Sequence, residues 1–171
     1  MSRVIARTER LELREFSTED AAFVLDLLNQ PAVLEFVGDK GVRNLEDARR
    51  YIEVSPLASY RENGFGHYVV TLRSHSVPIG LCGLFHRDFL DTPDLGFAFL
   101  AQHEGNGYAT EASGAVLSLA RDVLRMPTVF AMTDRDNGRS AKVLDKLGFR
   151  FARDFLVPGE NAPLRLYAVE L

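Results

Sequence analysis

The stretch that decides the fold is Asp94-Leu95-Gly96-Phe97-Ala98-Phe99-Leu100-Ala101-Gln102-His103-Glu104-Gly105-Asn106-Gly107-Tyr108-Ala109-Thr110-Glu111. Residues 95–100 form an apolar and aromatic run of strand length, and apolar residues recur at helical spacing over 109–123. Between them lies a polar loop, followed by a helix start whose backbone N–H groups have no intrahelical partner. Gly105 and Gly107 let a ligand approach the backbone closely. The stretch therefore predicts an anion site, with phosphate or pyrophosphate the usual ligand.

Spacing within the loop separates three kinds of phosphate-binding motif. A P-loop has Lys and then Ser or Thr after its last glycine, but Tyr108-Ala109 stands there. A dinucleotide-binding loop has Gly or Ala at its third position, where this chain has Thr110. The Gln-x-x-Gly-x-Gly pattern of Gln102, Gly105 and Gly107 directly follows a strand. In this it resembles the acetyl-CoA pyrophosphate loop of the GCN5-related N-acetyltransferase (GNAT) family.

Composition restricts the class of protein. The length of 171 residues predicts a single domain, 1–171, with a real core. A net charge of −4 argues against a nucleic-acid binder with a broad basic surface, and it is compatible with a cationic acceptor. One cysteine excludes a disulfide framework and a multi-cysteine zinc site, and the four histidines show no metal-ligand spacing. No signal-peptide core or membrane-spanning run is present, so we expect a cytoplasmic protein without a metal or a membrane partner.

The rest of the chain is a mixture of strand and helix patterns. Strands are predicted over 10–14, 68–72, 79–85, 95–100, 128–133, 149–157 and 164–171. Helices are predicted over 17–28, 44–60, from 109 to about 126, and over 140–147, with a helical turn at 31–37. Asn44 is expected to cap the second helix, and Pro56 to break or kink it. This order indicates one mixed α/β (α+β) layer fold rather than a Rossmann fold.

The order of elements resembles the GNAT family from end to end. Arg10-Leu11-Glu12-Leu13-Arg14 resembles its first strand, Ile79-Gly80-Leu81-Cys82-Gly83-Leu84 its third, and residues 137–149 its second signature. Tyr108-Ala109-Thr110-Glu111-Ala112 resembles the ribosomal-protein N-terminal acetyltransferase (RimJ/RimL-like) branch. The resemblance implies a central, mostly antiparallel twisted sheet with helices on both faces. It also implies an N-acetyltransferase, as monomer or homodimer, that passes the acetyl group of acetyl-CoA to a primary amine, either a protein N-terminus or a small-molecule amine.

Acetyl transfer to an amine needs a group that takes a proton, because the unperturbed pKa is about 10.4 for a lysine amine and about 8 for an α-amino group. Asp94 is the first candidate, since it begins the central strand beside the expected acetyl position. Relatives often carry Glu at the matching position, so the shorter Asp would act directly or through a water. Glu160, in the last hairpin, resembles another acidic position of the branch. Both residues are equally compatible with turn roles, so Asp94, Glu160 and a water chain stay open as the base.

Two further residues are candidates for binding the pantetheine arm of CoA and protonating its sulfur. Asn137 and Ser140 match the family's Asn-x-x-Ser, which implies that Asn137 holds the pantetheine arm and that Ser140 protonates the leaving sulfur. The same spacing is an N-cap signature, and an asparagine cap still has amide N–H groups to spare. The predicted catalytic residues are thus Asp94 and Ser140. The predicted cofactor-binding residues are Phe97, Ala98, Phe99, Leu100, Gln102, His103, Glu104, Gly105, Asn106, Gly107, Tyr108, Ala109, Asn137 and Ser140.

Two other functions stay open from the sequence. Asp134 ends the strand after the glycine helix, where a ribose-binding acid of a nicotinamide-dependent oxidoreductase would sit. The second open function is non-catalytic: the chain would keep the CoA-binding fold and act as a sensor or interaction module. Cys82, inside an apolar strand, is predicted to be a buried core thiol rather than a nucleophile.

Overall fold

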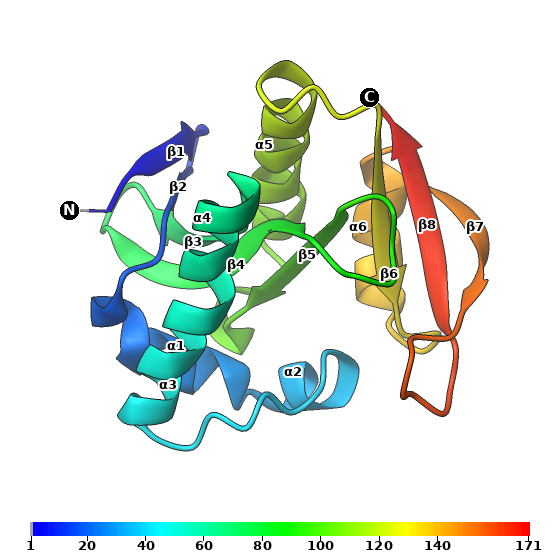
Figure 1. The fold of residues 1–171 in the computed structure, drawn as a ribbon. Helices are drawn as coiled ribbons and strands as arrows, with labels where there is room; N and C mark the ends of the chain where they lie inside the picture. The colour runs from blue at the N-terminus through cyan, green and yellow to red at the C-terminus, as the bar shows by residue number, and fades with distance from the viewer. Residues whose placement is uncertain (1) are drawn as a thin grey trace.

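The computed structural model describes residues 2–171, which form a twisted eight-stranded sheet with helices on both faces (Figure 1). The strands are β1 (Val4–Arg7), β2 (Leu11–Arg14), β3 (His67–Leu72), β4 (Val77–Phe85), β5 (Asp94–Phe99), β6 (Thr128–Thr133), β7 (Arg150–Phe155) and β8 (Leu164–Glu170). Their order across the sheet is β1-β2-β3-β4-β5-β6-β8-β7. Neighbouring strands pair antiparallel except β5 and β6, which are parallel. The predicted mixed fold and mostly antiparallel sheet are confirmed.

The helices are α1 (Ala21–Leu28), α2 (Pro31–Phe36), α3 (Leu45–Ile52), α4 (Ala58–Asn63), α5 (Tyr108–Asp122) and α6 (Gly138–Lys146). Short 3-10 turns lie at Thr18–Asp20 and Ala101–His103. None of the helices within 2–171 has both the length and the apolar content that crossing a bilayer requires.

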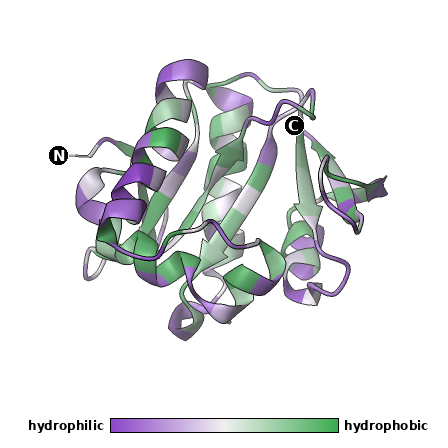
Figure 2. Ribbon diagram, turned by 60° about the horizontal axis from the view of Figure 1, so that its bottom comes forward, coloured by the Kyte–Doolittle hydropathy of each residue, from purple (hydrophilic) through white to green (hydrophobic). Residues whose placement is uncertain are grey.

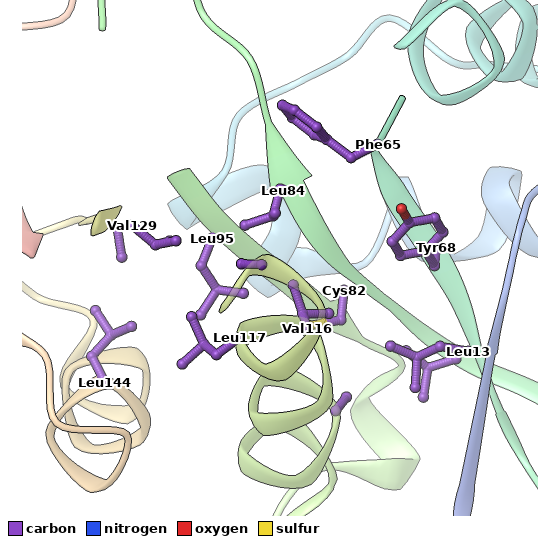
Figure 3. Close-up of a cluster of buried hydrophobic side chains, with 14 of the residues drawn as sticks. Leu13, Phe65, Tyr68, Cys82, Leu84, Leu95, Val116, Leu117, Val129 and Leu144 are labelled. Carbon is purple, nitrogen blue, oxygen red and sulfur yellow. The ribbon is translucent and has the colours of Figure 1, made fainter. Parts of the chain in front are cut away.

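Two apolar clusters hold the sheet between its helices. On one face, α5 packs on the central strands through Val116 and Leu117, against Cys82, Leu84 and Leu95 (Figure 3). On the other face, α1 and α3 pack on β3 and β4 in a second cluster. Figure 2 shows the central strands as mostly hydrophobic and the helices as alternating between hydrophobic and hydrophilic residues. Cys82 is fully buried, as predicted, and burial raises the pKa of its thiol to about 12.

β5 and β6 diverge from each other, and this divergence opens the site. β4 pairs with β5 from Gly80↔Phe99 to Phe85↔Asp94, the whole length of β5. β5 pairs with β6 only at Asp94↔Phe130 and Leu95↔Ala131. Beyond Leu95, the edge of β5 that would face β6 has no strand beside it, so its backbone groups are available to a ligand.

Local signals account for most helix boundaries. Asn44 Oδ1 accepts a hydrogen bond from the N–H of Asp47 at 2.8 Å, the predicted cap of α3. Pro56 does not end the helical segment: α3 continues through a π-helical turn, Glu53–Leu57, into α4. The wider turn accommodates the proline, which cannot donate the regular i→i−4 bond. β1 was not predicted, because Val4-Ile5-Ala6-Arg7 lacks the alternation of apolar and charged residues that predicted the equally short β2.

Candidate active site

A cavity of about 510 Å³ lies where β5 parts from β6. One wall is the end of β5, a second is the glycine loop with the first turn of α5, and a third is the start and inner face of α6. The fourth wall is α2 with Val37, which contributes apolar side chains. Segments far apart in the sequence therefore meet around one hollow.

Most of the residues predicted to bind a cofactor line this cavity: Phe97, Ala98, Phe99, His103, Glu104, Gly105, Gly107, Tyr108, Ala109, Asn137 and Ser140. Three do not line it. Leu100 is buried in the cluster under α1 and α3, and Gln102 is an exposed residue of the 3-10 turn. Asn106 folds back on its own loop, where Nδ2 donates to the carbonyl oxygens of His103 at 3.1 Å and Glu104 at 3.3 Å.

The glycine loop has the backbone conformation that its sequence requires. Gly105 and Gly107 both have φ of +80°, in the left-handed region that other residues resist. Gly107 is the residue directly before α5, a helix of 15 residues. The first N–H groups of α5 therefore lie beside Gly107 at one wall of the cavity, where they and the helix dipole favour an anion.

The exposed edge of β5 supplies further backbone groups. Leu100 N–H donates to the carbonyl oxygen of Ile79 at 2.9 Å, which fixes the alternation of hydrogen bonds between β4 and β5. By this alternation, the N–H and C=O groups of Phe97 and Phe99 point away from β4, toward the side that β6 has left. They are positioned to bind an extended chain or to stabilise charge on an oxygen.

Asn137 and Ser140 meet at the start of α6. Asn137 Oδ1 accepts a hydrogen bond from Ser140 N–H at 3.2 Å, so the capping role is present. This bond uses only the amide oxygen, and the two amide N–H donors of Asn137 remain for a ligand. Arg139 forms an ion pair with Glu104 of the glycine loop, and both residues line the cavity.

Cations on α6 belong to the site, although none of them was among the predicted site residues. Lys142 and Lys146 line the cavity together with Val143. Their spacing from Arg139, three and seven residues, places them on one helix face. The helix predicted over 140–147 already places Lys142 and Lys146 four residues apart on one face, so the sequence held a signal that could have identified the two lysines.

Asp94 lies at the closed end of the divergence, where β5 still pairs with β6, and it does not line the cavity. It is 2% exposed, and Arg87 Nε donates to its Oδ1 at 2.7 Å. Burial raises the pKa of Asp94, although the hydrogen bond from Arg87 opposes this shift. Glu160 is exposed in the turn between β7 and β8. The structure thus does not bring the candidate bases together with Ser140 in the cavity.

A buried histidine beside Arg87 was missed in the sequence. The ring of His67 stacks on Phe85 with centroids 4.7 Å apart, and its Nε2 lies 3.4 Å from Tyr51 Oη. The guanidinium carbon of Arg87 lies 5.2 Å from the centroid of the Phe85 ring. Burial, aided by the charges of Arg87 and Lys40, lowers the pKa of His67 to about 3. No spacing rule marks such a residue, because its neighbours come from separate strands and a helix.

The comparisons with known proteins agree with this architecture. Residues 10–150 match the family model described as an acetyltransferase (GNAT) domain. An uncharacterized N-acetyltransferase, YnaD of Bacillus subtilis (strain 168), is 26% identical over 144 residues, 84% of this chain and 81% of YnaD. The crystal structure of an acetyltransferase from Agrobacterium tumefaciens str. C58 has a TM-score of 0.82 and 27% identity, over 98% of this chain and 94% of that one.

A further structure shares the fold at lower identity. RimL, a ribosomal L7/L12 alpha-N-protein acetyltransferase, has a TM-score of 0.82 at 13% identity, over 100% of this chain and 96% of that one. The chain belongs to the GNAT acetyltransferase family, because the family model covers most of its length. It is therefore an enzyme of the acyltransferase class, and the family match favours this class over the oxidoreductase and non-catalytic alternatives that the sequence left open.

Proposed function

We propose that this protein is an acetyl-CoA-dependent N-acetyltransferase, one domain over residues 1–171, that acetylates a primary amine by direct attack in a ternary complex. The observation that carries the proposal is that one cavity joins the exposed edge of β5, the left-handed glycine loop and the capped start of α6. These walls offer backbone groups, an anion site and amide donors in series. A long ligand with a diphosphate in its middle matches that series.

In this proposal each wall has its own task. Acetyl-CoA supplies the activated acetyl group. The loop with Gly105 and Gly107 binds the diphosphate, the edge of β5 binds the pantetheine arm, and Asn137 donates to that arm. An N–H of Phe97 or Phe99 stabilises the negative charge that develops on the acetyl oxygen. When the new C–N bond forms and the C–S bond breaks, Ser140 passes its proton to the leaving thiolate and regains a proton from water.

The amine must lose a proton, and we propose Asp94 as the group that receives it through a water. Its buried position and raised pKa support a role in proton transfer. Its place outside the cavity lining favours a relay over direct contact. Glu160 is the alternative base. The acceptor is either a peptide N-terminus, which the resemblance of residues 108–112 suggests, or a small amine.

Calorimetric titration with acetyl-CoA, with NAD in parallel, tests the proposal. We expect acetyl-CoA to bind and Gly107→Val to weaken binding by at least about tenfold, equivalent to about 1.4 kcal/mol, because a side chain at a φ of +80° distorts the anion site. Gly64→Val is the matched control: Gly64 has a φ of +77° but ends α4, outside the cavity lining. Equal loss in both variants, or binding of NAD alone, would contradict the proposal.

A screen of amine acceptors then tests the catalytic roles. We expect Asp94→Asn and Ser140→Ala to lower turnover while acetyl-CoA still binds. Turnover that neither substitution changes would remove both residues from the mechanism. Binding of acetyl-CoA without turnover of any peptide or small amine would indicate a sensor role for this chain.

A further inference from the structure

An arginine from the N-terminal hairpin reaches the glycine loop from outside the cavity. Arg10 lies between β1 and β2, and its Nη1 donates to the carbonyl oxygen of Asn106 at 2.9 Å. Its guanidinium lies 4.6 Å from the ring centroid of Tyr108, the first residue of α5. A Cβ at Gly107 would be 3.4 Å from Arg10 Nη2. The side chain of Arg10 thus bonds to Asn106, lies over Tyr108 and passes close to Gly107 between them, at the point where the loop becomes a helix.

Glu111, in the first turn of α5, fixes this arginine. Arg10 Nε donates to Glu111 Oε2 at 2.7 Å, and Nη2 lies 2.7 Å from the same oxygen. The other oxygen, Oε1, accepts from the Arg10 backbone N–H at 2.9 Å and from Thr8 Oγ1 at 2.6 Å. Partial burial by itself raises the pKa of Glu111, but the bonds from Thr8 and Arg10 outweigh it and leave the pKa below its usual value. The carboxylate is fully engaged, and it joins parts of the chain about 100 residues apart.

The bond to Asn106 sets the direction of the next backbone N–H. In a trans peptide the C=O and the following N–H point in opposite directions. Because Arg10 holds the Asn106 carbonyl on the hairpin side, the N–H of Gly107 points away from the hairpin, and Gly107 lines the cavity. The side chain of Asn106 bonds to the carbonyl oxygens of His103 and Glu104, whereas the bond from Arg10 is made to the Asn106 carbonyl itself, which shares its peptide plane with the N–H of Gly107.

Arg10 also offsets the negative charge of Glu111 at the start of α5. A carboxylate in the first turn of α5 would repel a diphosphate bound at the same helix start. The guanidinium neutralises Glu111 and leaves the helix start attractive to an anion.

We propose that Arg10, held by Glu111 and Thr8, is a positioning residue that fixes the glycine loop in the conformation that binds the diphosphate of the acyl donor. This inference rests on the proposed function. It predicts that the three residues affect recognition of the diphosphate and leave recognition of the pantetheine arm unchanged.

The test compares two donors, acetyl-CoA and S-acetylpantetheine, which ends before the diphosphate. Dissociation constants are measured by calorimetry for acetyl-CoA and by ligand-observed NMR for the weaker S-acetylpantetheine. We expect Arg10→Gln and Glu111→Gln to weaken acetyl-CoA binding about tenfold, and to leave S-acetylpantetheine within about twofold of the wild type. Arg10→Lys keeps the charge but loses the planar fork, so it should also weaken acetyl-CoA.

Two further variants keep the test decisive. Arg7→Gln is the matched control, since Arg7 pairs with Glu12 at 2.8 Å on the same hairpin. It should bind both donors as the wild type does. Thr8→Val removes the hydroxyl bond to Glu111 and the bond that the same oxygen accepts from Leu11 N–H at 3.1 Å, but it keeps the ion pair of Arg10 with Glu111. It should therefore show a smaller loss, about threefold, for acetyl-CoA alone.

Unchanged acetyl-CoA affinity in the folded variants would overturn the inference and leave the proposed function intact. Equal losses for both donors would also overturn it, because they would indicate general damage. Tighter acetyl-CoA binding by Glu111→Gln would overturn it as well, because it would show that only charge matters and not the orientation of the loop. A wild type that does not bind acetyl-CoA would overturn both proposals.

Discussion

The ion pair between Asp94 and Arg87 sets the conditions under which Asp94 can accept a proton. Burial favours the neutral acid and raises the pKa of the carboxyl group, while the bond from Arg87 at 2.7 Å favours the carboxylate. Burial is the larger effect. A base with a raised pKa holds a proton more readily, which suits a group that must deprotonate an amine.

Removing Arg87 should therefore move the acid side of the pH–rate profile. In Arg87→Gln the carboxylate loses its partner, so the pKa of Asp94 rises further and kcat/KM falls at a higher pH than in the wild type. Asp94→Asn should lower kcat by about 10²- to 10⁴-fold over the whole range. The measurement is kcat/KM against pH with one acceptor. The control is Arg135→Gln, which breaks an exposed ion pair with Asp154 and should leave the pH–rate profile unchanged. If the acid side of the profile does not move in Arg87→Gln, Asp94 is excluded as the base.

His67 should make the protein less stable in acid. Its pKa of about 3 in the folded state lies below its usual value of 6.5, so between these pH values the unfolded chain binds one more proton than the folded one. The free energy of unfolding should fall as pH decreases from about 6.5, by up to about 1.4 kcal/mol for each pH unit. Urea denaturation from pH 4 to pH 7 measures this slope.

The slope should become smaller by that amount in His67→Phe, which places an apolar ring beside Phe16 and Phe85 without a titratable group. His75→Gln serves as the control, since His75 is exposed in the turn before β4. A slope in His67→Phe equal to that of the wild type would mean that other groups cause the acid sensitivity.

At the scale of elements, helix starts carry local and separable contributions to stability. Asn44 holds the first turn of α3 through its bond to Asp47 N–H, and the turn also carries Glu46 and Asp47 next to the positive end of the helix dipole. α3 is anchored further by Ala48 and Ile52, both fully buried. Loss of the cap should therefore weaken the protein without unfolding it.

Asn44→Ala should lower the free energy of unfolding by about 1 kcal/mol, a fall in Tm of about 2–4 °C for a chain of this size. The reason is that the N–H of Asp47 loses its acceptor. Thermal denaturation followed by circular dichroism measures the change. Asn161→Ala, in the exposed turn before β8, should leave Tm unchanged; a Tm of Asn44→Ala equal to that of the wild type would show that water replaces the cap at no cost.

These elements were largely predictable because their signals lie within a few residues of sequence. Asn44, Asn137 and Gly107 each mark a helix start in the structure. β1 has no comparable signal, and it is defined by its pairing with β2. The π-helical turn around Pro56 is another tertiary outcome, since the residue predicts a disturbance but not its form.

At the scale of the whole molecule, the predictable part of the site is the part built from contiguous residues. The glycine loop and the Asn137–Ser140 start of α6 were found from spacing, and they meet in one cavity. The divergence of β5 from β6, the place of β8 between β6 and β7, and the pairs Arg87–Asp94 and Arg10–Glu111 are set by tertiary packing. Asp94 therefore had a predictable position in the chain but an unpredictable environment.

The charge distribution gives the last prediction. The chain has a net charge of −4, yet the cavity is lined by Lys142 and Lys146, so local cations must offset a field that repels an anionic donor. The double variant Lys142→Gln/Lys146→Gln should bind acetyl-CoA several-fold more weakly at low salt. Because salt screens these charges, the difference from the wild type should shrink as ionic strength rises from about 0.01 M to 1 M, where the Debye length falls from about 30 Å to 3 Å.

A second double variant separates local charge from net charge. Arg121→Gln/Arg125→Gln also removes two positive charges, but it removes them near the end of α5 that is far from the cavity. A helix of this length places them about 20 Å from that turn, beyond the Debye length at physiological salt. Calorimetric titration of both double variants over the salt series should show a salt-dependent loss for the lysine pair and none at physiological salt for the arginine pair. Equal losses would mean that net charge alone governs donor binding and that the lysines of α6 have no special role in it.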